Sequence, residues 1–218
     1  MVCCDHQDHL DFANNGNESY SHSHLVYSDD GENWKVGGVA DRLTNECAVA
    51  EVWRPPFAFL LFGSKTAGTR FAQLWNGTIV VNSRDYLGQK EHTTHRAISW
   101  SDSGGETLSH VFRAPSLPDP IVEGSMTTDL EGKLLVFVHP NSETSRDKIT
   151  LYSSEDGGRG WRPRLVLDAR LGGGYSSVIA LANGSFAVAH DVGSTHMHRC
   201  SQAPGGRGCG EAFAVVTL

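Results

Sequence analysis

The stretch SEDGGRGW at Ser154–Trp161 decides the fold, because it places a turn motif between two segments rich in β-forming residues. Residues 149–153 before it read ITLYS, and residues 162–170 after it read RPRLVLDAR. In the pattern Ser-x-Asp-x-Gly-x-x-Trp, Asp156 can accept hydrogen bonds from backbone N–H groups of its own turn, and the central glycines permit positive φ. Trp161 supplies a large apolar side chain at the start of the next segment. The stretch therefore predicts a turn between two β-strands.

Two imperfect copies of this motif lie nearer the N-terminus, YSDDGENW at Tyr27–Trp34 and SDSGGETL at Ser101–Leu108. The first has Tyr27 where the pattern has Ser, and the second has Ser103 at the Asp position and Leu108 at the Trp position. The residues that match the pattern in the three copies are Asp29, Gly31, Trp34, Ser101, Gly105, Ser154, Asp156, Gly158 and Trp161. Three such units predict repeated four-stranded blades, which are the signature of an all-β propeller.

Composition and charge fit this fold class and exclude others. The chain has 218 residues, of which 39% are hydrophobic and 24 are glycines. Its net charge of −7 argues against nucleic-acid binding, which needs a basic face. We find no apolar run of about 18 residues and therefore predict no transmembrane segment. Residues 1–10 lack the basic and apolar regions of a signal peptide, and the sequence assigns no cellular compartment.

The cysteines and histidines suggest two metal clusters that we do not favour. One would combine Cys3 and Cys4 with the histidines at 6 and 9, and the other would combine the histidines at 196 and 198 with Cys200. Adjacent cysteines rarely bind one zinc ion, and no second CxxC-type half follows. The five cysteines fit no disulfide framework that we identify. We interpret them as free thiols and expect no metal.

One segment, at about 53–75, differs in composition from everything around it, with a proline pair, an apolar run and a basic, Gly-rich tail. The interval from Asp29 to Ser103 is 74 residues, whereas the interval from Ser103 to Asp156 is 53. Removing the segment makes the intervals nearly equal and joins its flanks into a hairpin of the strand–NG–strand type. We interpret it either as an insertion, such as a retained intron, or as a loop at the rim of the propeller.

Four residues at predicted strand ends or in adjoining loops carry a resemblance to a known family. They are Glu46 in NECAVAEV, Arg84 in VVNSRD, Arg146 in SETSRD and Tyr175 in GGGYSSVIAL. In order and spacing they resemble the Glu, the second and third arginines and the Tyr of exo-α-sialidases (neuraminidases). The repeated turn is similar to the aspartate box of that family, and the segments DPIVEGSM and AFAVVTL also resemble it. The resemblance covers nearly the whole chain apart from residues 53–75.

The resemblance implies a six-bladed β-propeller of sialidase type, of which residues 1–218 would form roughly the C-terminal three to four blades as one domain. It implies the hydrolysis, with retention, of terminal α-linked sialic acid from glycoproteins, glycolipids or oligosaccharides, so that the partner is a sialylated glycan. No cofactor is implied. Tyr175 would be the nucleophile and Glu46 its general base. Arg84 and Arg146 would bind the substrate carboxylate through their planar guanidinium groups.

The residues also allow plainer interpretations. Tyr175 could be a packed aromatic at the rim, and the two arginines could pair with the aspartates that follow them. Glu51 competes with Glu46 for the role of base. In the family pattern N-E-x-x-x-x-E the first Glu is the base, which favours Glu46.

The chain also departs from the family. Sialidases need an Arg in an F-R-I-P-type motif and an Asp acid/base, both in N-terminal blades, and neither has a counterpart here. The Glu of an L-Y-E motif, which orients that Arg, is replaced in AHD by Asp191. We therefore expect that N-terminal blades are missing from this chain. The alternative function is a non-catalytic or decayed propeller that binds sialoglycans or another partner.

Three Asn-x-Ser/Thr sequons occur, at Asn17, Asn76 and Asn183. The last two lie in NG turns between strand-like runs. We interpret those two as hairpin turns rather than as glycosylation sites.

Overall fold

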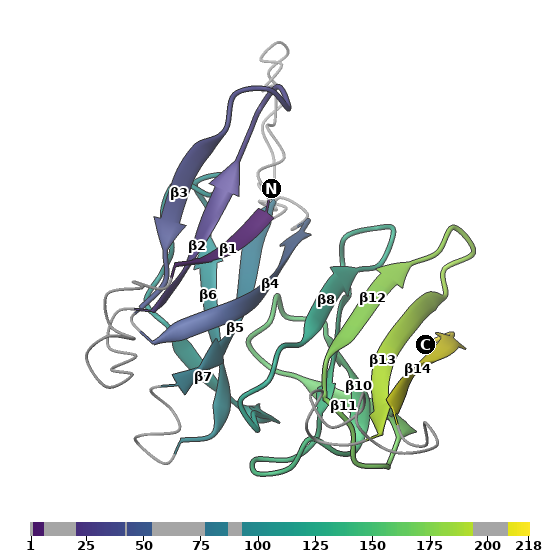
Figure 1. The fold of residues 1–218 in the computed structure, drawn as a ribbon. Coiled ribbons are helices and arrows are strands. Elements are labelled where there is room, and N and C mark those ends of the chain that lie inside the picture. The colour runs from purple at the N-terminus through teal and green to yellow at the C-terminus, as the bar shows by residue number, and fades with distance from the viewer. Residues whose placement is uncertain (1, 7–20, 42, 54–76, 87–92, 194–208) are drawn as a thin grey trace, which may run out of the picture.

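The computed structural model describes residues 2–6, 21–41, 43–53, 77–86, 93–193 and 209–218. Over these ranges the chain forms β-strands in four antiparallel sheets (Figure 1). The strands are β1 (Val2–His6), β2 (His22–Tyr27), β3 (Lys35–Val39), β4 (Thr44–Val52), β5 (Thr78–Asp85), β6 (His95–Ser101), β7 (Phe112–Pro118), β8 (Ser125–Thr128), β9 (Leu135–Pro140), β10 (Ile149–Ser154), β11 (Arg162–Asp168), β12 (Ser176–Ala180), β13 (Phe186–Gly193) and β14 (Cys209–Val216).

Each sheet is built from strands that follow one another in the sequence. The first sheet has the order β1-β2-β3, the second β4-β5-β6-β7, the third β8-β9-β10-β11 and the fourth β12-β13-β14. Strand β8 contacts both β4 and β12, so the first strands of the last three sheets lie side by side. Figure 1 shows the sheets arranged one after another along the chain, as successive blades. The predicted fold class, part of an all-β propeller, is confirmed.

The turn between β10 and β11 is held by the SEDGGRGW motif at Ser154–Trp161. Ser154 Oγ donates to Asp156 Oδ1 over 2.8 Å and accepts from the Gly158 N–H at 2.9 Å. The same Asp156 oxygen accepts from the N–H groups of Arg159 and Gly160 at 3.0 and 2.9 Å. Gly158 has a φ of 87°, which a residue with a Cβ adopts only under strain. The carboxylate therefore replaces the hydrogen bonds that the two strands lose at the turn.

The turn between β6 and β7 uses the same geometry with a hydroxyl in place of the carboxylate. Ser101 Oγ accepts from the Gly105 N–H at 3.0 Å, as Ser154 does in its turn. Ser103 Oγ accepts from the Thr107 N–H at 2.9 Å. Ser103 thus occupies the position of the box aspartate but offers the turn fewer acceptor sites.

In the turn between β2 and β3 the residues that form the box hydrogen bonds lie one position later than the pattern match predicts. Ser28 Oγ donates to Asp30 Oδ1 at 2.9 Å, and Asp30 accepts from the Asn33 N–H at 2.7 Å. Asp29, which we aligned with the box aspartate, instead forms an exposed ion pair with Lys35 at 3.1 Å. The pattern match at Asp29 and the hydrogen-bonding geometry at Asp30 therefore differ by one position.

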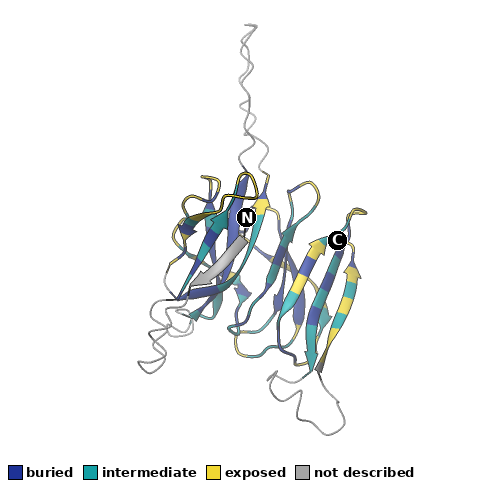
Figure 2. Ribbon diagram, turned by 45° about the horizontal axis from the view of Figure 1, so that its top comes forward, coloured by how far each residue is buried: buried dark blue, intermediate teal, exposed yellow. Residues whose placement is uncertain are grey.

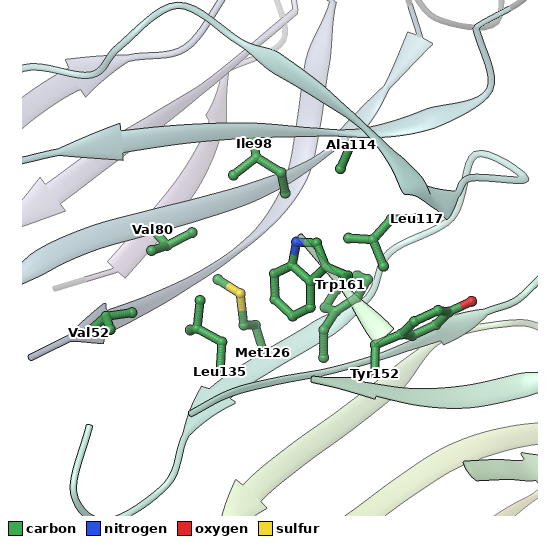
Figure 3. Close-up of a cluster of buried hydrophobic side chains, with 10 residues drawn as sticks. Val52, Val80, Ile98, Ala114, Leu117, Met126, Leu135, Tyr152 and Trp161 are labelled. Carbon is green, nitrogen blue, oxygen red and sulfur yellow. The ribbon is translucent and has the colours of Figure 1, made fainter. Parts of the chain in front are cut away.

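Side chains at the Trp position of the boxes pack between successive sheets. Trp161 is only 4% exposed and lies between the second and third sheets (Figure 3). The side chains around it include Val80, Ile98, Ala114 and Leu117 from the second sheet and Met126, Leu135 and Tyr152 from the third. In the second box, Leu108 packs against the cluster that Leu25 of the first sheet forms with β5. Trp34 of the first box has no described sheet on its outer side and is 53% exposed.

The first and fourth sheets each expose large apolar side chains on one face. Figure 2 marks exposed residues in yellow. On the first sheet this face carries Val36 and Val39 beside Trp34. On the fourth sheet it carries Ile179 of β12 together with Phe213 and Val215 of β14. Within the described ranges no helix is long and apolar enough to cross a membrane.

The structure corrects two interpretations made from the sequence, and one predicted segment lies almost wholly outside the described residues. The proline-containing segment HVFRAPSLPDPIVEGSM, which reads as a long connection in the sequence, contains β7 and the first two residues of β8. The prolines of β7 are tolerated because β7 is an edge strand of its sheet. Cys47 is disulfide-bonded, so our interpretation of the cysteines as free thiols is wrong for this residue. The segment predicted as an insertion lies outside the described residues except for Trp53, whose N–H donates to the Gly132 carbonyl.

Candidate functional site

The four residues singled out from the sequence come from four places in three sheets. Glu46 lies near the start of β4, and Arg84 lies near the end of β5, the antiparallel neighbour of β4. Arg146 lies in the connection between β9 and β10, and Tyr175 directly precedes β12. Strand starts and strand ends alternate at one end of an antiparallel sheet, which places all four at the same end of their blades.

Tyr175 and Glu46 contact each other directly. The Tyr175 hydroxyl donates to Glu46 Oε1 over 3.0 Å, across 129 positions in the sequence. Glu46 lies where the pairing of β4 with β5 shifts register, between Asn45 and Ala48, and its φ is 38°. Such bulges re-aim a side chain out of the regular alternation of a strand. A left-handed backbone at a non-glycine residue is also uncommon, so the surrounding structure must hold it in place.

Arg84 holds the other side of the Glu46 carboxylate. Its Nη1 lies 2.7 Å from Glu46 Oε2, and its Nε donates to Asn45 Oδ1 at 2.8 Å. Its Nη2 donates to the hydroxyl of Tyr86, and Arg84 as a whole is 7% exposed. The plainer interpretation, in which Arg84 pairs with the aspartate after it, does not match this geometry, since Asp85 pairs with another arginine 2.7 Å away.

Arg146 is positioned by backbone carbonyls rather than by a carboxylate. Its Nη1 donates to the Gly173 carbonyl at 3.1 Å and its Nη2 donates to the Ile121 carbonyl at 2.8 Å. The guanidinium carbon lies 5.9 Å from the centre of the Tyr175 ring. A Cβ at position 173 would stand 2.4 Å from a carboxylate oxygen of Asp191, so a larger residue here would require the Asp191 side chain to move. Asp191 thus lies behind the loop that carries Tyr175.

The electrostatic environment keeps Tyr175 protonated. Burial raises the pKa of Tyr175, and the charge of Glu46 and its hydrogen bond raise it further. Arg84 and Arg146 act in the opposite direction on the same pKa. The phenol is therefore a neutral hydrogen-bond donor near pH 7, with a carboxylate ready to accept its proton and two cations beside it.

Sequence reasoning missed a further carboxylic acid at the site, Glu123. Burial raises the pKa of Glu123, and the charges of Glu46 and Asp191 act in the same direction. The N–H of Ser176, next to Tyr175, and the charge of Arg96 oppose this rise. The segment DPIVEGSM was noted as a resemblance, but nothing in its spacing distinguished Glu123 from a surface glutamate.

Glu51, the competitor of Glu46, is remote from Tyr175. The two glutamates are five positions apart along β4, which corresponds to roughly 16 Å of regular strand. Glu51 lines a hollow of about 520 Å³ with Asp29, Ser103 and other residues of the first two box turns. Several residues considered for metal binding or glycosylation lie outside the described ranges, namely Asn17, Asn76, His9, His196, His198 and Cys200.

Comparisons with known proteins agree with the fold. The family described as BNR repeat-like domain matches residues 1–188. A curated relative is a sialidase of Micromonospora viridifaciens, 27% identical over 130 residues that cover 56% of this chain and 19% of that protein. The chain therefore spans about a fifth of that relative's length.

Solved structures of sialidases also resemble this chain in fold. The Hadza microbial sialidase Hz136 is 27% identical, with a TM-score of 0.59 over 78% of this chain and 29% of that chain. A Trypanosoma rangeli sialidase in complex with 2,3-difluorosialic acid, described as a covalent intermediate, is 19% identical. Its TM-score is 0.53 over 80% of this chain and 25% of that chain. At that identity the second likeness concerns the fold alone.

Proposed function

The chain belongs to the family of BNR repeat-like domains and has the fold of part of a sialidase propeller, and we propose that it serves the hydrolysis of terminal α-linked sialic acid. One observation carries the proposal. Tyr175 donates to Glu46, and the same carboxylate is paired with Arg84. A tyrosine with a purely structural role does not need a carboxylate that accepts from its hydroxyl, an arginine paired with that carboxylate and a second arginine near its ring.

The proposed chemistry uses Tyr175 as a neutral nucleophile. Its oxygen bonds to the anomeric carbon while Glu46 takes the phenol proton, and the bond to the departing oxygen breaks with its electron pair on that oxygen. The departing oxygen takes a proton from water or from an acid outside these residues. Water then attacks the same carbon and gives its proton to the base that the first step left, which is hydroxide or the conjugate base of that acid. The bond to Tyr175 breaks with its electron pair on the phenol oxygen, which regains its proton from Glu46. Two displacements at one carbon give retention.

Arg84 and Arg146 fit the binding of the sialic acid carboxylate. A carboxylate on the anomeric carbon would repel an anionic nucleophile, which gives a neutral phenol its advantage. The contacts of Arg84 with Asn45, Glu46 and Tyr86 fix its guanidinium plane and use three of its five N–H donors. A preorganised guanidinium loses little freedom when it binds a carboxylate.

We also propose that the exposed sheet faces take further blades of the same propeller. Trp161 shows where the Trp of a box packs when a preceding sheet is present. Trp34, Val36 and Val39 would pack in the same way against a preceding blade, and Phe213, which is 76% exposed, against a following one. Propellers remove their edges by closure, and these faces are the two ends of an incomplete ring.

The second candidate is a non-catalytic sialoglycan-binding propeller. It is favoured by the lack of counterparts for the F-R-I-P arginine and the Asp acid/base in this sequence. In this case Arg84 and Arg146 would still bind the carboxylate, but the glycosidic bond would stay intact.

One experiment separates the two candidates. Hydrolysis of a fluorogenic α-sialoside and equilibrium binding of N-acetylneuraminic acid are measured for the wild-type protein and for Tyr175→Phe. The proposal predicts turnover that is lost in the variant while binding remains. Binding without turnover in the wild-type protein supports the second candidate, and full turnover by Tyr175→Phe would exclude Tyr175 as the nucleophile.

A further inference from the structure

A carboxylate outside the four site residues, Asp119, lies fully buried between the second and third sheets. It follows β7 and is 1% exposed. Its partners include two cationic or ionisable side chains, Arg96 Nη1 at 3.5 Å and His139 Nε2 at 3.4 Å, both with 0% exposure. A charge buried so deeply is retained only where its surroundings use all of its acceptor capacity.

One oxygen of Asp119 fixes the turn that follows it. Asp119 Oδ1 accepts from the N–H groups of Ile121 at 2.9 Å and Val122 at 3.3 Å. Ile121 has a φ of 58°, and a β-branched residue in this left-handed region is strained. Such a conformation persists only when the surrounding contacts over-determine it. The two hydrogen bonds from Asp119 supply those contacts, together with the 2.6 Å bond from Arg96 Nη1 to the Val122 carbonyl.

The strained turn presents a carbonyl to the site. The Ile121 carbonyl accepts from Arg146 Nη2 at 2.8 Å, and this is one of the two hydrogen bonds that hold the Arg146 guanidinium near Tyr175. If Ile121 relaxed to an ordinary backbone conformation, this carbonyl would turn away. The position of Arg146 therefore depends on the buried carboxylate two residues before Ile121.

The second oxygen of Asp119 contacts the strand that carries the other arginine. Asp119 Oδ2 accepts from the N–H of Asp85 at 3.3 Å, and Asp85 directly follows Arg84 at the end of β5. Asparagine could not replace this arrangement, because its amide has one acceptor oxygen and its NH₂ group would face N–H donors.

We propose that Asp119 is a positioning residue for both arginines, with one oxygen fixing the turn that holds Arg146 and the other fixing the strand end that carries Arg84. It touches no substrate in this scheme and acts through the backbone. The clamping of a carboxylate by the two arginines rests on the proposed function, whereas the effect of Asp119 on Arg146 does not.

The test uses the pKa of the Tyr175 phenol to report whether Arg146 keeps its position, and it needs no substrate. The pKa of Tyr175 is measured by NMR of ring-labelled tyrosine, and the signal is assigned by its loss in Tyr175→Phe. Because Arg146 lowers this pKa, its release in Asp119→Asn should raise the pKa of Tyr175 by roughly half a pH unit. Loss of the Asp119 charge alone would lower the pKa or leave it unchanged, so the two explanations differ in sign.

A rescue and a control complete the test. Ile121→Gly in the Asp119→Asn background should return the pKa of Tyr175 toward the wild-type value, because glycine adopts the left-handed conformation without strain. His139→Gln removes another neighbour of Asp119 and should leave the pKa unchanged. If Asp119→Asn does not fold, Asp119→Glu keeps the charge while displacing both oxygens, and the same rise is expected.

Three results would overturn the proposal: an unchanged or lower pKa in the Asp119 variant, a rise that Ile121→Gly does not reverse, or an equal rise in His139→Gln. Binding of N-acetylneuraminic acid is measured in parallel, with a loss of at least several-fold expected for Asp119→Asn. If the wild-type protein itself does not bind, the proposed function fails, while the titration still decides the role of Asp119.

Discussion

Replacing Trp161 by alanine tests the repeated-blade architecture most severely, because this side chain joins two sheets. Trp161 is 4% exposed and packs within the cluster between the second and third sheets. Truncation of a buried tryptophan to alanine destabilises a protein by about 3–5 kcal/mol. The variant also loses the 3.0 Å bond from Trp161 Nε1 to the Gly158 carbonyl, a contribution of about 1 kcal/mol. We therefore expect a loss of about 4 kcal/mol or more, which is a large part of the stability of a typical domain.

The control is Trp34→Ala, the same substitution at the same motif position in the first box. Trp34 is 53% exposed, so its truncation should change the free energy of unfolding by less than about 1 kcal/mol. Urea unfolding followed by far-ultraviolet circular dichroism measures both variants. Measured on residues 1–218 alone, in which Trp34 is exposed, equal losses at the two positions would refute the role of the box Trp as an inter-sheet anchor.

Three further predictions follow from single contacts. Ser103→Asp should raise the free energy of unfolding, measured with urea, by up to about 1 kcal/mol. A carboxylate accepts hydrogen bonds from the N–H groups of the turn between β6 and β7 more strongly than a hydroxyl does, and a loss of stability would contradict this. Burial lowers the pKa of His139, so the unfolded chain binds more protons and stability should fall as the pH drops below about 6.5. In His139→Gln the free energy of unfolding should depend less on pH in this range. The further loss of stability between about pH 4 and 2, which comes from protonation of Asp119 with its pKa lowered to about 2, should remain. Arg146→Lys should weaken binding of N-acetylneuraminic acid at least tenfold, as measured by calorimetry, because an ammonium group cannot reach both carbonyls as a planar fork; unchanged affinity would remove Arg146 from the clamp.

The fold class could be predicted from the sequence because the boxes fix local turns whose residues are close in the chain. Ser154, Asp156 and Gly158 meet within one turn, so their spacing alone specifies the geometry. The first box was harder, because Gly31 and Trp34 align Asp29 with the pattern whereas the hydrogen bonds of the turn go to Asp30.

The site was predictable only in part, because its contacts are long-range. The resemblance pointed to Tyr175 and Glu46, but their spatial contact across the blades cannot be read from local spacing. The bulge that re-aims Glu46 leaves no sequence signal, since no glycine marks it. Asp119 also escaped notice, because DP reads as an ordinary turn and the partners of its carboxylate come from three distant strands.

The most direct test of the central claim is covalent trapping of the nucleophile. The protein is incubated with 2,3-difluorosialic acid, the ligand of the Trypanosoma rangeli complex described as a covalent intermediate, and its intact mass and tryptic peptides are measured. We expect one sialyl adduct on the peptide that contains Tyr175, and no adduct in Tyr175→Phe. Absence of an adduct in the wild-type protein, or an adduct on another residue, would contradict the assignment of Tyr175 as the nucleophile.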